Sequence, residues 1–221
     1  MMTRGEAVLV HGAWHGASCW DGVVAELGDR GIPTTAVDLP LAGLAADVAA
    51  ARAAIEAAGA GAVVVGHSYG GLVISEAAAG LPVHRLVYLA AFLAEPGEDM
   101  LGLLAGSKLV DAIVLDEAGV SVDPAVAAEV FYGDADPATA AALVARLRPM
   151  AIDAAPASSV APAWRSIPTT YVVCTGDQAL PVPSQRTMAA RADEVVEWPT
   201  DHSPFVTRPG AIADLVARCF A

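Results

Sequence analysis

Short apolar runs alternate with longer alanine-rich stretches along the 221 residues of the chain. The apolar runs are rich in valine and bounded by glycine, a pattern typical of strands that are buried on both faces of a parallel sheet. Crossover connections of this length are right-handed, so the alternation predicts an α/β fold with a mostly parallel, doubly wound sheet of about six strands. We expect strands at residues 7–11, 34–37, 62–66, 85–90, 170–174 and 194–198, and helices at residues 20–30, 44–58, 71–79, 183–190 and 210–220.

One long interval interrupts this alternation. About 75 residues separate the fourth expected strand from the fifth, which is too long for a simple crossover. We interpret residues 93–164 as a lid inserted over the carboxyl edge of the sheet, where open α/β sheets bind ligands. Residues 1–92 and 165–221 then form the core. Within the lid we expect a hairpin around residues 109–122 and helices near residues 124–131 and 137–147.

Composition and charge narrow the classes of partner. The chain carries 12 basic and 25 acidic residues, a net charge of −13, and the basic residues are scattered singly. This distribution argues against nucleic-acid binding, which needs a basic face. No apolar run approaches the roughly 20 residues of a membrane-spanning helix, and the first strand comes too early for a signal peptide. We expect a soluble cytoplasmic protein with no membrane partner, and the oligomeric state stays open, a homodimer included.

The segment Gly-His-Ser-Tyr-Gly at residues 66–70 fits the pattern Gly-x-Ser-x-Gly. Chance supplies this pattern in about one such chain in twelve, so its context matters. Here it follows an expected strand directly and opens an expected helix, which is the arrangement of a nucleophile elbow. The flanking glycines permit the close approach of strand and helix. We predict that Ser68 is a nucleophile in a strained turn, and the alternative is a serine that caps a helix.

Serine is a poor nucleophile unless a base removes its proton, so a histidine is required. We select His202, which lies on a loop after the last expected strand and before the final helix. His67 is fixed beside the nucleophile and is expected to face the core, and His84 precedes a strand at the wrong edge of the sheet. His11 and His15 follow the first strand and could border the pocket without serving as the base.

The base needs a carboxylate that orients its ring, supplied by another loop at the carboxyl edge. Asp177 follows the strand at 170–174 and completes the order Ser, Asp, His that this fold uses. Asp201 is adjacent to His202 and poorly placed to reach its ring. Glu95, shortly after the fourth strand, is the alternative acid.

A tetrahedral intermediate needs two hydrogen-bond donors for its oxyanion. We expect one to be the backbone N–H of Tyr69 and the other the backbone N–H of Ala13, on the loop after the first strand. Gly12 lets this loop come close to the nucleophile, and a simple glycine turn is the alternative interpretation of the loop. We expect the substrate pocket to be lined by Gly12, Trp14, Phe92, Leu104, Phe131 and Tyr132, although such apolar residues can also serve only to pack the lid against the sheet.

Four segments carry a family resemblance: residues 11–20, the elbow at 66–70, residues 89–93 and residues 171–177. They resemble the plant methylesterase and hydroxynitrile lyase branch of the α/β-hydrolases and its bacterial esterase relatives. The resemblance spans nearly the whole chain. It implies a triad of Ser68, Asp177 and His202 and an oxyanion hole at Ala13 and Tyr69. The chain lacks the extra amino-terminal hairpin of larger members, which favours six strands over eight.

Two positions distinguish the chemistries within this branch. Hydroxynitrile lyases carry a threonine where this chain has Gly12 and a lysine where it has Ser203. We therefore expect a serine esterase that cleaves a small to medium hydrophobic carboxylic ester through an acyl-enzyme on Ser68, with no metal or organic cofactor. The alternatives are a hydroxynitrile lyase or other cofactor-free proton-transfer enzyme on the same triad, and a non-catalytic ligand-binding protein on the same scaffold.

Overall fold

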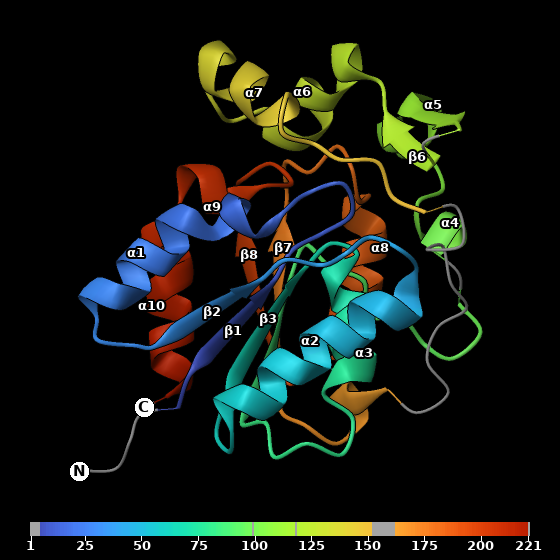
Figure 1. Ribbon diagram of the computed structural model, residues 1–221. Coiled ribbons are helices and arrows are strands. Elements are labelled where there is room, and N and C mark those ends of the chain that lie inside the picture. Colours follow the sequence, from blue (N-terminus) through green and yellow to red (C-terminus); the bar gives the residue numbers. More distant parts are fainter. Residues whose placement is uncertain (1–4, 99, 118, 152–161, 221) are drawn as a thin grey trace.

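The computed structural model describes residues 5–98, 100–117, 119–151 and 162–220. Its centre is a six-stranded sheet in which every neighbouring pair is parallel (Figure 1). This architecture confirms the predicted fold class. In spatial order the strands are β2 (Thr34–Val37), β1 (Ala7–Val10), β3 (Val63–His67), β4 (Arg85–Leu89), β7 (Thr169–Cys174) and β8 (Glu194–Trp198).

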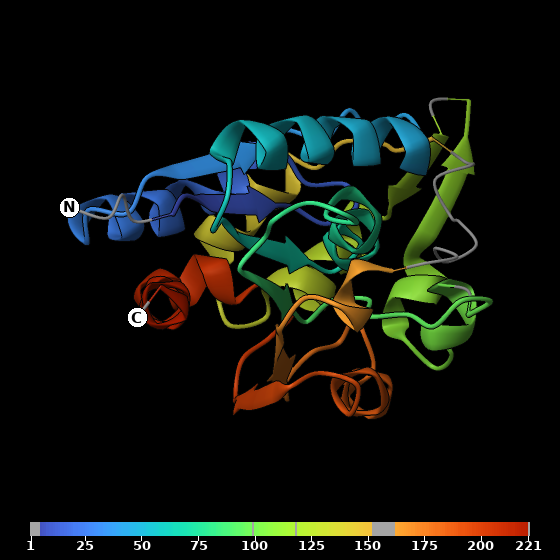
Figure 2. The same ribbon diagram turned by 90° about the horizontal axis from the view of Figure 1, so that it is seen from below.

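The valine-rich runs form strands because both of their faces are buried. Along β3, Val63 and Val65 belong to one apolar core while Val64 between them belongs to the other, since successive side chains point to opposite faces. Figure 2 shows these two layers from below, with the helices on either side of the twisted sheet. One face is covered by α1 (Asp21–Asp29) and α10 (Pro209–Cys219), and the other by α2 (Leu44–Ala58), α3 (Gly70–Ala77) and α8 (Val182–Ala189).

The strand order places two loops side by side at the carboxyl edge. From β1 the chain goes to β2 on one side, and it then returns to β3 on the other side. The register pairs Val10 of β1 with Gly66 of β3, so the loops that follow these two strands leave the sheet at the same level. Such a reversal of strand order opens a crevice between the loops, where this class of sheet binds ligands.

The described part of the lid lies beyond the carboxyl ends of the strands (Figure 1). The two longer helices of the described lid begin at residues 124 and 137, as expected, because Asp123 and Asp136 cap them and a proline follows each cap. The hairpin expected from residue 109 is wrong at its start: Ser107 accepts the backbone N–H of Leu109 and begins a short helix there. The lid elements are α4 (Met100–Leu103), α5 (Lys108–Ala112), the antiparallel strands β5 (Ile113–Asp116) and β6 (Gly119–Val122), α6 (Pro124–Tyr132) and α7 (Pro137–Val144).

Shorter elements complete the chain: the 3-10 helices η1 (Ala17–Trp20) and η3 (Ala163–Arg165), and the short helix α9 (Pro204–Thr207). Among the described residues, no helix combines the length and the apolar character needed to cross a membrane.

Candidate active site

Ser68 lies in the sharp turn between β3 and α3. Its φ is 51°, in the left-handed region that residues other than glycine rarely adopt, and such strain concentrates at functional sites. The flanking glycines are required by distance: a Cβ on Gly66 would lie 2.7 Å from the carbonyl oxygen of Gly70, and a Cβ on Gly70 would lie 2.7 Å from that of His11. The turn therefore has the elbow geometry that the sequence predicts, and it presents Ser68 to a cavity.

His202 and Asp177 form a buried pair beside this cavity. His202 follows β8 and Asp177 follows β7, and the Nδ1 of His202 lies 2.7 Å from the Oδ2 of Asp177. Because a carboxylate only accepts, Nδ1 carries the proton and Nε2 is left as the basic nitrogen. Ser68 and His202 line the same cavity, with no hydrogen bond between their side chains in the described structure. Such bonds often form only when substrate is bound.

The carboxylate of Asp177 is fixed by three further donors. Its Oδ1 accepts the backbone N–H groups of Ala179 at 2.7 Å and Leu180 at 2.9 Å, and its Oδ2 accepts the Nε2 of Gln185 at 2.8 Å. Gln185 is fully buried on α8, and its Oε1 accepts the backbone N–H of Cys174 at 2.9 Å. Gln185 was not predicted from the sequence. The only signal is a polar residue in a helix shortly after the acid, and the pattern does not show that its face is buried.

Ala13 and Tyr69, the two predicted oxyanion donors, border the cavity next to Ser68. Gly12 stands behind the nucleophile, where a Cβ would lie 2.9 Å from the Cβ of Ser68. A side chain at position 12 would therefore prevent this close approach of the loop to the elbow. The main-chain N–H of Ala13 donates no hydrogen bond to any described residue, so it is available to an oxyanion.

A second residue that sequence reasoning missed is Asp47, on α2. It is fully buried, and its Oδ2 accepts the hydroxyl of Tyr69 at 2.7 Å. Its Oδ1 accepts the backbone N–H of Leu41 at 2.8 Å. Burial raises the pKa of Asp47. The Tyr69 hydroxyl is thus anchored on α2, which helps to fix the backbone next to Ser68.

The other four histidines do not occupy the position of the base. His67 is buried, burial lowers its pKa well below the usual value, and its Nε2 donates to the backbone oxygen of His202 at 2.9 Å. Burial also lowers the pKa of His11 to about 4 and that of His15 to about 3, so both rings are neutral near pH 7. His84 is exposed at the opposite edge of the sheet. His202 is the one histidine whose side chain lines the cavity with Ser68.

The alternative acids have other partners. Glu95 forms an ion pair with Arg165. The Oδ1 of Asp201 accepts the backbone N–H of Ser203 at 2.9 Å, and its Oδ2 accepts that of Asp134 at 3.0 Å. Of these three carboxylates, Asp177 is the one bonded to the His202 ring in the described structure.

The cavity has a volume of about 210 Å³ and is almost entirely apolar. Three of the predicted pocket residues, Trp14, Phe92 and Leu104, line it together with Ser68 and His202. The lid also supplies Leu101 and Leu115, which the sequence did not single out. They are 58% and 67% exposed, so the mouth of the cavity is an apolar surface in contact with solvent.

Gly12, Phe131 and Tyr132 do not line this cavity. Phe131 packs behind it, with its ring centroid 5.9 Å from that of Trp14 and 5.8 Å from that of His202. The hydroxyl of Tyr132 points to the Nε2 of His15 at 2.9 Å, and Tyr132 borders a separate hollow of about 380 Å³. Lid packing therefore keeps both rings of α6 out of the cavity.

The fold, the elbow and the buried Asp–His pair together define the class of protein. The family described as the alpha/beta hydrolase family matches residues 7–215, and this chain belongs to it. Among curated proteins, it is similar to the alpha/beta hydrolase nvfD of Aspergillus novofumigatus, with 29% identity over 143 residues. That match covers 62% of this chain and 55% of the relative, so it spans about half of the relative's length.

Solved structures share this fold over nearly the whole of both chains. A pyrethroid hydrolase from Sphingobium faniae is 25% identical with a TM-score of 0.82, and the alignment covers 99% of this chain and 98% of that one. A methylesterase from Arabidopsis is 22% identical with a TM-score of 0.74, covering 96% of this chain and 97% of that one.

Proposed function

We propose that the chain is a serine esterase that cleaves uncharged, hydrophobic carboxylic esters through an acyl-enzyme on Ser68. One observation carries the proposal: a serine in a left-handed elbow shares its cavity with a histidine whose Nδ1 is bonded to a buried carboxylate. The similarity to a pyrethroid hydrolase and a methylesterase supports ester hydrolysis as the reaction class.

The geometry supports a two-step acyl transfer. The Nε2 of His202 accepts the Ser68 proton as Oγ attacks the ester carbonyl, and Asp177 stabilises the imidazolium. The backbone N–H groups of Ala13 and Tyr69 hold the resulting oxyanion. Collapse of the intermediate breaks the ester C–O bond, and His202 returns its proton to the leaving alcohol. Water then attacks the acyl-enzyme by the same route and releases the acid.

The cavity lining supports a neutral, apolar substrate. No aspartate, glutamate, lysine or arginine side chain lines the cavity among the described residues. A charged substrate group would therefore be desolvated there without a counter-ion, which is costly. The exposed side chains of Leu101 and Leu115 extend the apolar surface to the mouth, so ester groups longer than the cavity keep apolar contacts there.

The same lining argues against cyanohydrin cleavage. Departing cyanide needs a cation, whereas the residue after the catalytic histidine is Ser203, which is fully buried and does not line the cavity. A threonine in place of Gly12 would place its Cβ against Ser68. Release of an aldehyde from a cyanohydrin without a covalent Ser68 adduct would favour the lyase, and tight ligand binding without a burst of product would favour a binding protein.

The test uses Ser68→Ala with Ser18→Ala as its control, since Ser18 is exposed. We expect Ser68→Ala to abolish both the hydrolysis of p-nitrophenyl esters and the covalent labelling by a fluorophosphonate, while Ser18→Ala keeps both. A panel of esters with acyl chains of increasing length should show kcat/KM rising with chain length. Substantial activity in Ser68→Ala would remove Ser68 as the nucleophile.

A further inference from the structure

Trp14 directly follows the oxyanion donor Ala13 and adopts a strained backbone conformation. Its φ is 63°, in the left-handed region, where a large aromatic residue is rare. Such a conformation persists only where the surroundings hold it. The contacts that hold Trp14 therefore also fix the direction of the peptide groups on either side of Ala13.

Two hydrogen bonds hold Trp14, and both come from the lid. Its backbone oxygen accepts the N–H of Arg148 at 2.7 Å, and its indole Nε1 donates to the backbone oxygen of Val120 at 2.9 Å. Val120 and Met150 exchange two backbone hydrogen bonds, at 2.8 and 2.9 Å. The two lid segments that contact Trp14 are thus joined to each other and act as one support.

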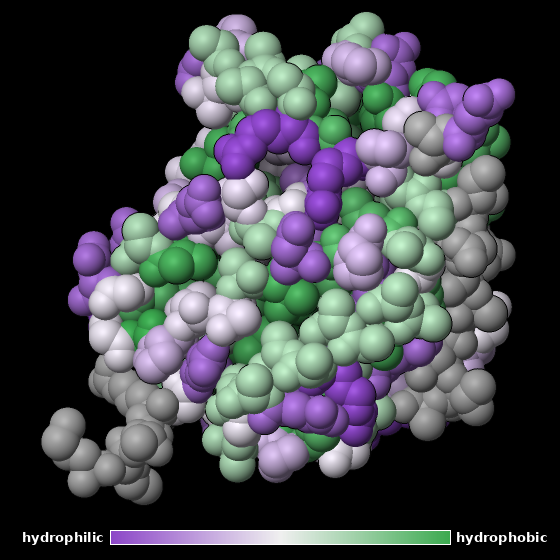
Figure 3. Space-filling model, in the orientation of Figure 1, coloured by the Kyte–Doolittle hydropathy of each residue, from purple (hydrophilic) through white to green (hydrophobic). Residues whose placement is uncertain are grey.

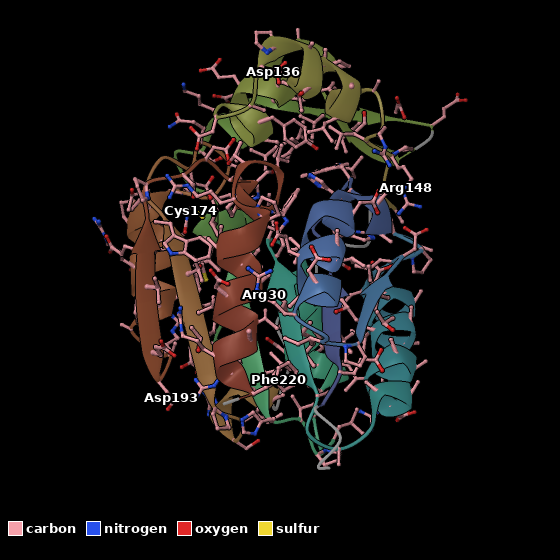
Figure 4. The ribbon with its side chains drawn as sticks, turned by 90° about the vertical axis from the view of Figure 1, so that its left-hand side faces the viewer. Arg30, Asp136, Arg148, Cys174, Asp193 and Phe220 are labelled. Atoms are coloured by element: carbon pink, nitrogen blue, oxygen red, sulfur yellow. The ribbon has the colours of Figure 1, made fainter. Side chains whose placement is uncertain are left out.

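The lid also holds His15, the next residue of the loop. The guanidinium of Arg148 donates to the backbone oxygen of His15, with Nη2 at 2.9 Å and Nε at 3.2 Å. The Tyr132 hydroxyl donates to the Nε2 of His15, whose Nδ1 donates to the backbone oxygen of Ala13 at 2.7 Å. Figure 4 shows Arg148 at the junction of lid and core, where hydrophilic side chains gather in Figure 3.

We propose that Trp14 is a positioning residue through which the lid sets the oxyanion hole, so that docking of the lid and assembly of the hole are one event. This inference rests on the proposed esterase function. With the lid bonds in place, Trp14 stays left-handed and the Ala13 N–H points to the position of the oxyanion. Without them the loop relaxes toward an ordinary backbone conformation, and that donor is misdirected.

The test separates oxyanion stabilisation from simple anchoring of the lid. Trp14→Phe removes the indole N–H and keeps an aromatic ring. Because a directly removed oxyanion donor costs 10²–10³ in kcat, we expect the misaligned donor to lower kcat about tenfold, in addition to any change in KM that the altered cavity lining produces. Trp164→Phe is the matched control, since the Trp164 indole donates to the backbone oxygen of Ala94 at the edge of the lid. We expect its kinetics to be unchanged.

Two ketone inhibitors of equal chain length, one trifluoromethyl and one methyl, distinguish loss of oxyanion stabilisation from loss of lid anchoring. With an alkyl trifluoromethyl ketone, Ser68 Oγ adds to the carbonyl carbon, its proton passes to His202, and the ketone oxygen becomes an oxyanion in the hole. The methyl ketone of equal chain length occupies the same cavity without this charge. Because Trp14 also lines the cavity, its replacement affects contacts with both ketones alike. In Trp14→Phe we therefore expect the ratio of trifluoromethyl ketone affinity to methyl ketone affinity to fall about tenfold, as kcat does.

Tyr132→Phe provides a second variant, which leaves both lid hydrogen bonds of Trp14 in place and removes only the hydroxyl bonded to His15. We expect the same loss in kcat and in the ratio of the two ketone affinities, at a smaller factor. If either folded variant raised KM and left kcat and the ratio of the two ketone affinities unchanged, the lid bonds would be anchors only and the coupling would be rejected. A wild-type chain without ester turnover would instead overturn the esterase proposal itself, and the coupling with it.

Discussion

Replacing Gln185 with leucine should lower both the free energy of unfolding and kcat, because the buried Gln185 amide donates and accepts several hydrogen bonds. Leucine has a similar volume but cannot donate to the Oδ2 of Asp177 or to the backbone oxygen of Leu180, nor accept the backbone N–H of Cys174. A hydrogen bond to a charged group contributes about 1.5–3 kcal/mol, and each buried group left without a partner costs about 1–3 kcal/mol. Partial relaxation brings the expected loss in the free energy of unfolding to about 3–5 kcal/mol.

The effect of Gln185→Leu on catalysis should be smaller than the loss of the acid itself. Asp177 keeps its bonds to two backbone N–H groups and to His202, so the imidazole keeps its tautomer. We expect kcat to fall about tenfold, against about 10⁴-fold when the acid becomes an amide, as in Asp177→Asn.

Urea denaturation followed by circular dichroism measures the free energy of unfolding, and steady-state hydrolysis of a p-nitrophenyl ester measures kcat. Gln178→Leu is the matched control, since Gln178 is exposed and its only described side-chain bond is a 3.3 Å contact with the backbone oxygen of Gly176. We expect this control to lie within about 0.5 kcal/mol of wild type. A Gln185→Leu protein as stable as the control, with unchanged kcat, would refute the reasoning.

Two further predictions concern the loop behind the nucleophile and the buried histidines. Gly12→Ala places a Cβ 2.9 Å from the Cβ of Ser68 and should therefore displace the Ser68 side chain. We expect kcat and the rate of fluorophosphonate labelling to fall about 10²-fold, and an unaltered labelling rate would contradict this. His11, His15 and His67 have pKa values lowered by burial, so below the unfolded value of about 6.5 only the unfolded chain binds protons at these sites. The contribution of these three groups to the free energy of unfolding should be intact above pH 6.5. It should fall by up to about 4 kcal/mol per pH unit between pH 6 and 4.5, because up to three protons bind to the unfolded chain alone. A urea midpoint that stays unchanged over that range would contradict the prediction.

The elbow and the pairing of Asp177 with His202 could be predicted because they depend on local sequence and on sheet topology. Gly66 is required by a backbone contact within the turn, and Gly70 by the close approach of the backbone at the end of β1, so the spacing of the two glycines marks the turn. Asp177 and His202 each follow a strand of a parallel sheet, and the carboxyl ends of such strands share one edge.

The supporting residues could not be predicted, because their roles depend on which face of a helix is packed. Asp47 lies in a helix with alanine on nearly every face, so the pattern does not show that its side chain points inward to Tyr69. The rings of Phe131 and Tyr132 are adjacent on a lid helix, and only docking of the whole lid decides that neither reaches the cavity. The helix at Lys108–Ala112 depends on the side chain of Ser107, within an apolar run that also fits a strand.

The apolar side chains at the mouth of the cavity can be replaced to change the range of substrates without destabilising the fold. Leu101 and Leu115 line the cavity yet are more than half exposed, so their replacement disturbs little buried packing. Selection can therefore retune which esters enter by substitutions there, while Val120 and Arg148, whose backbones hold Trp14, keep their place. A library of variants for a new ester specificity would vary Leu101 and Leu115 and leave Val120 and Arg148 unchanged.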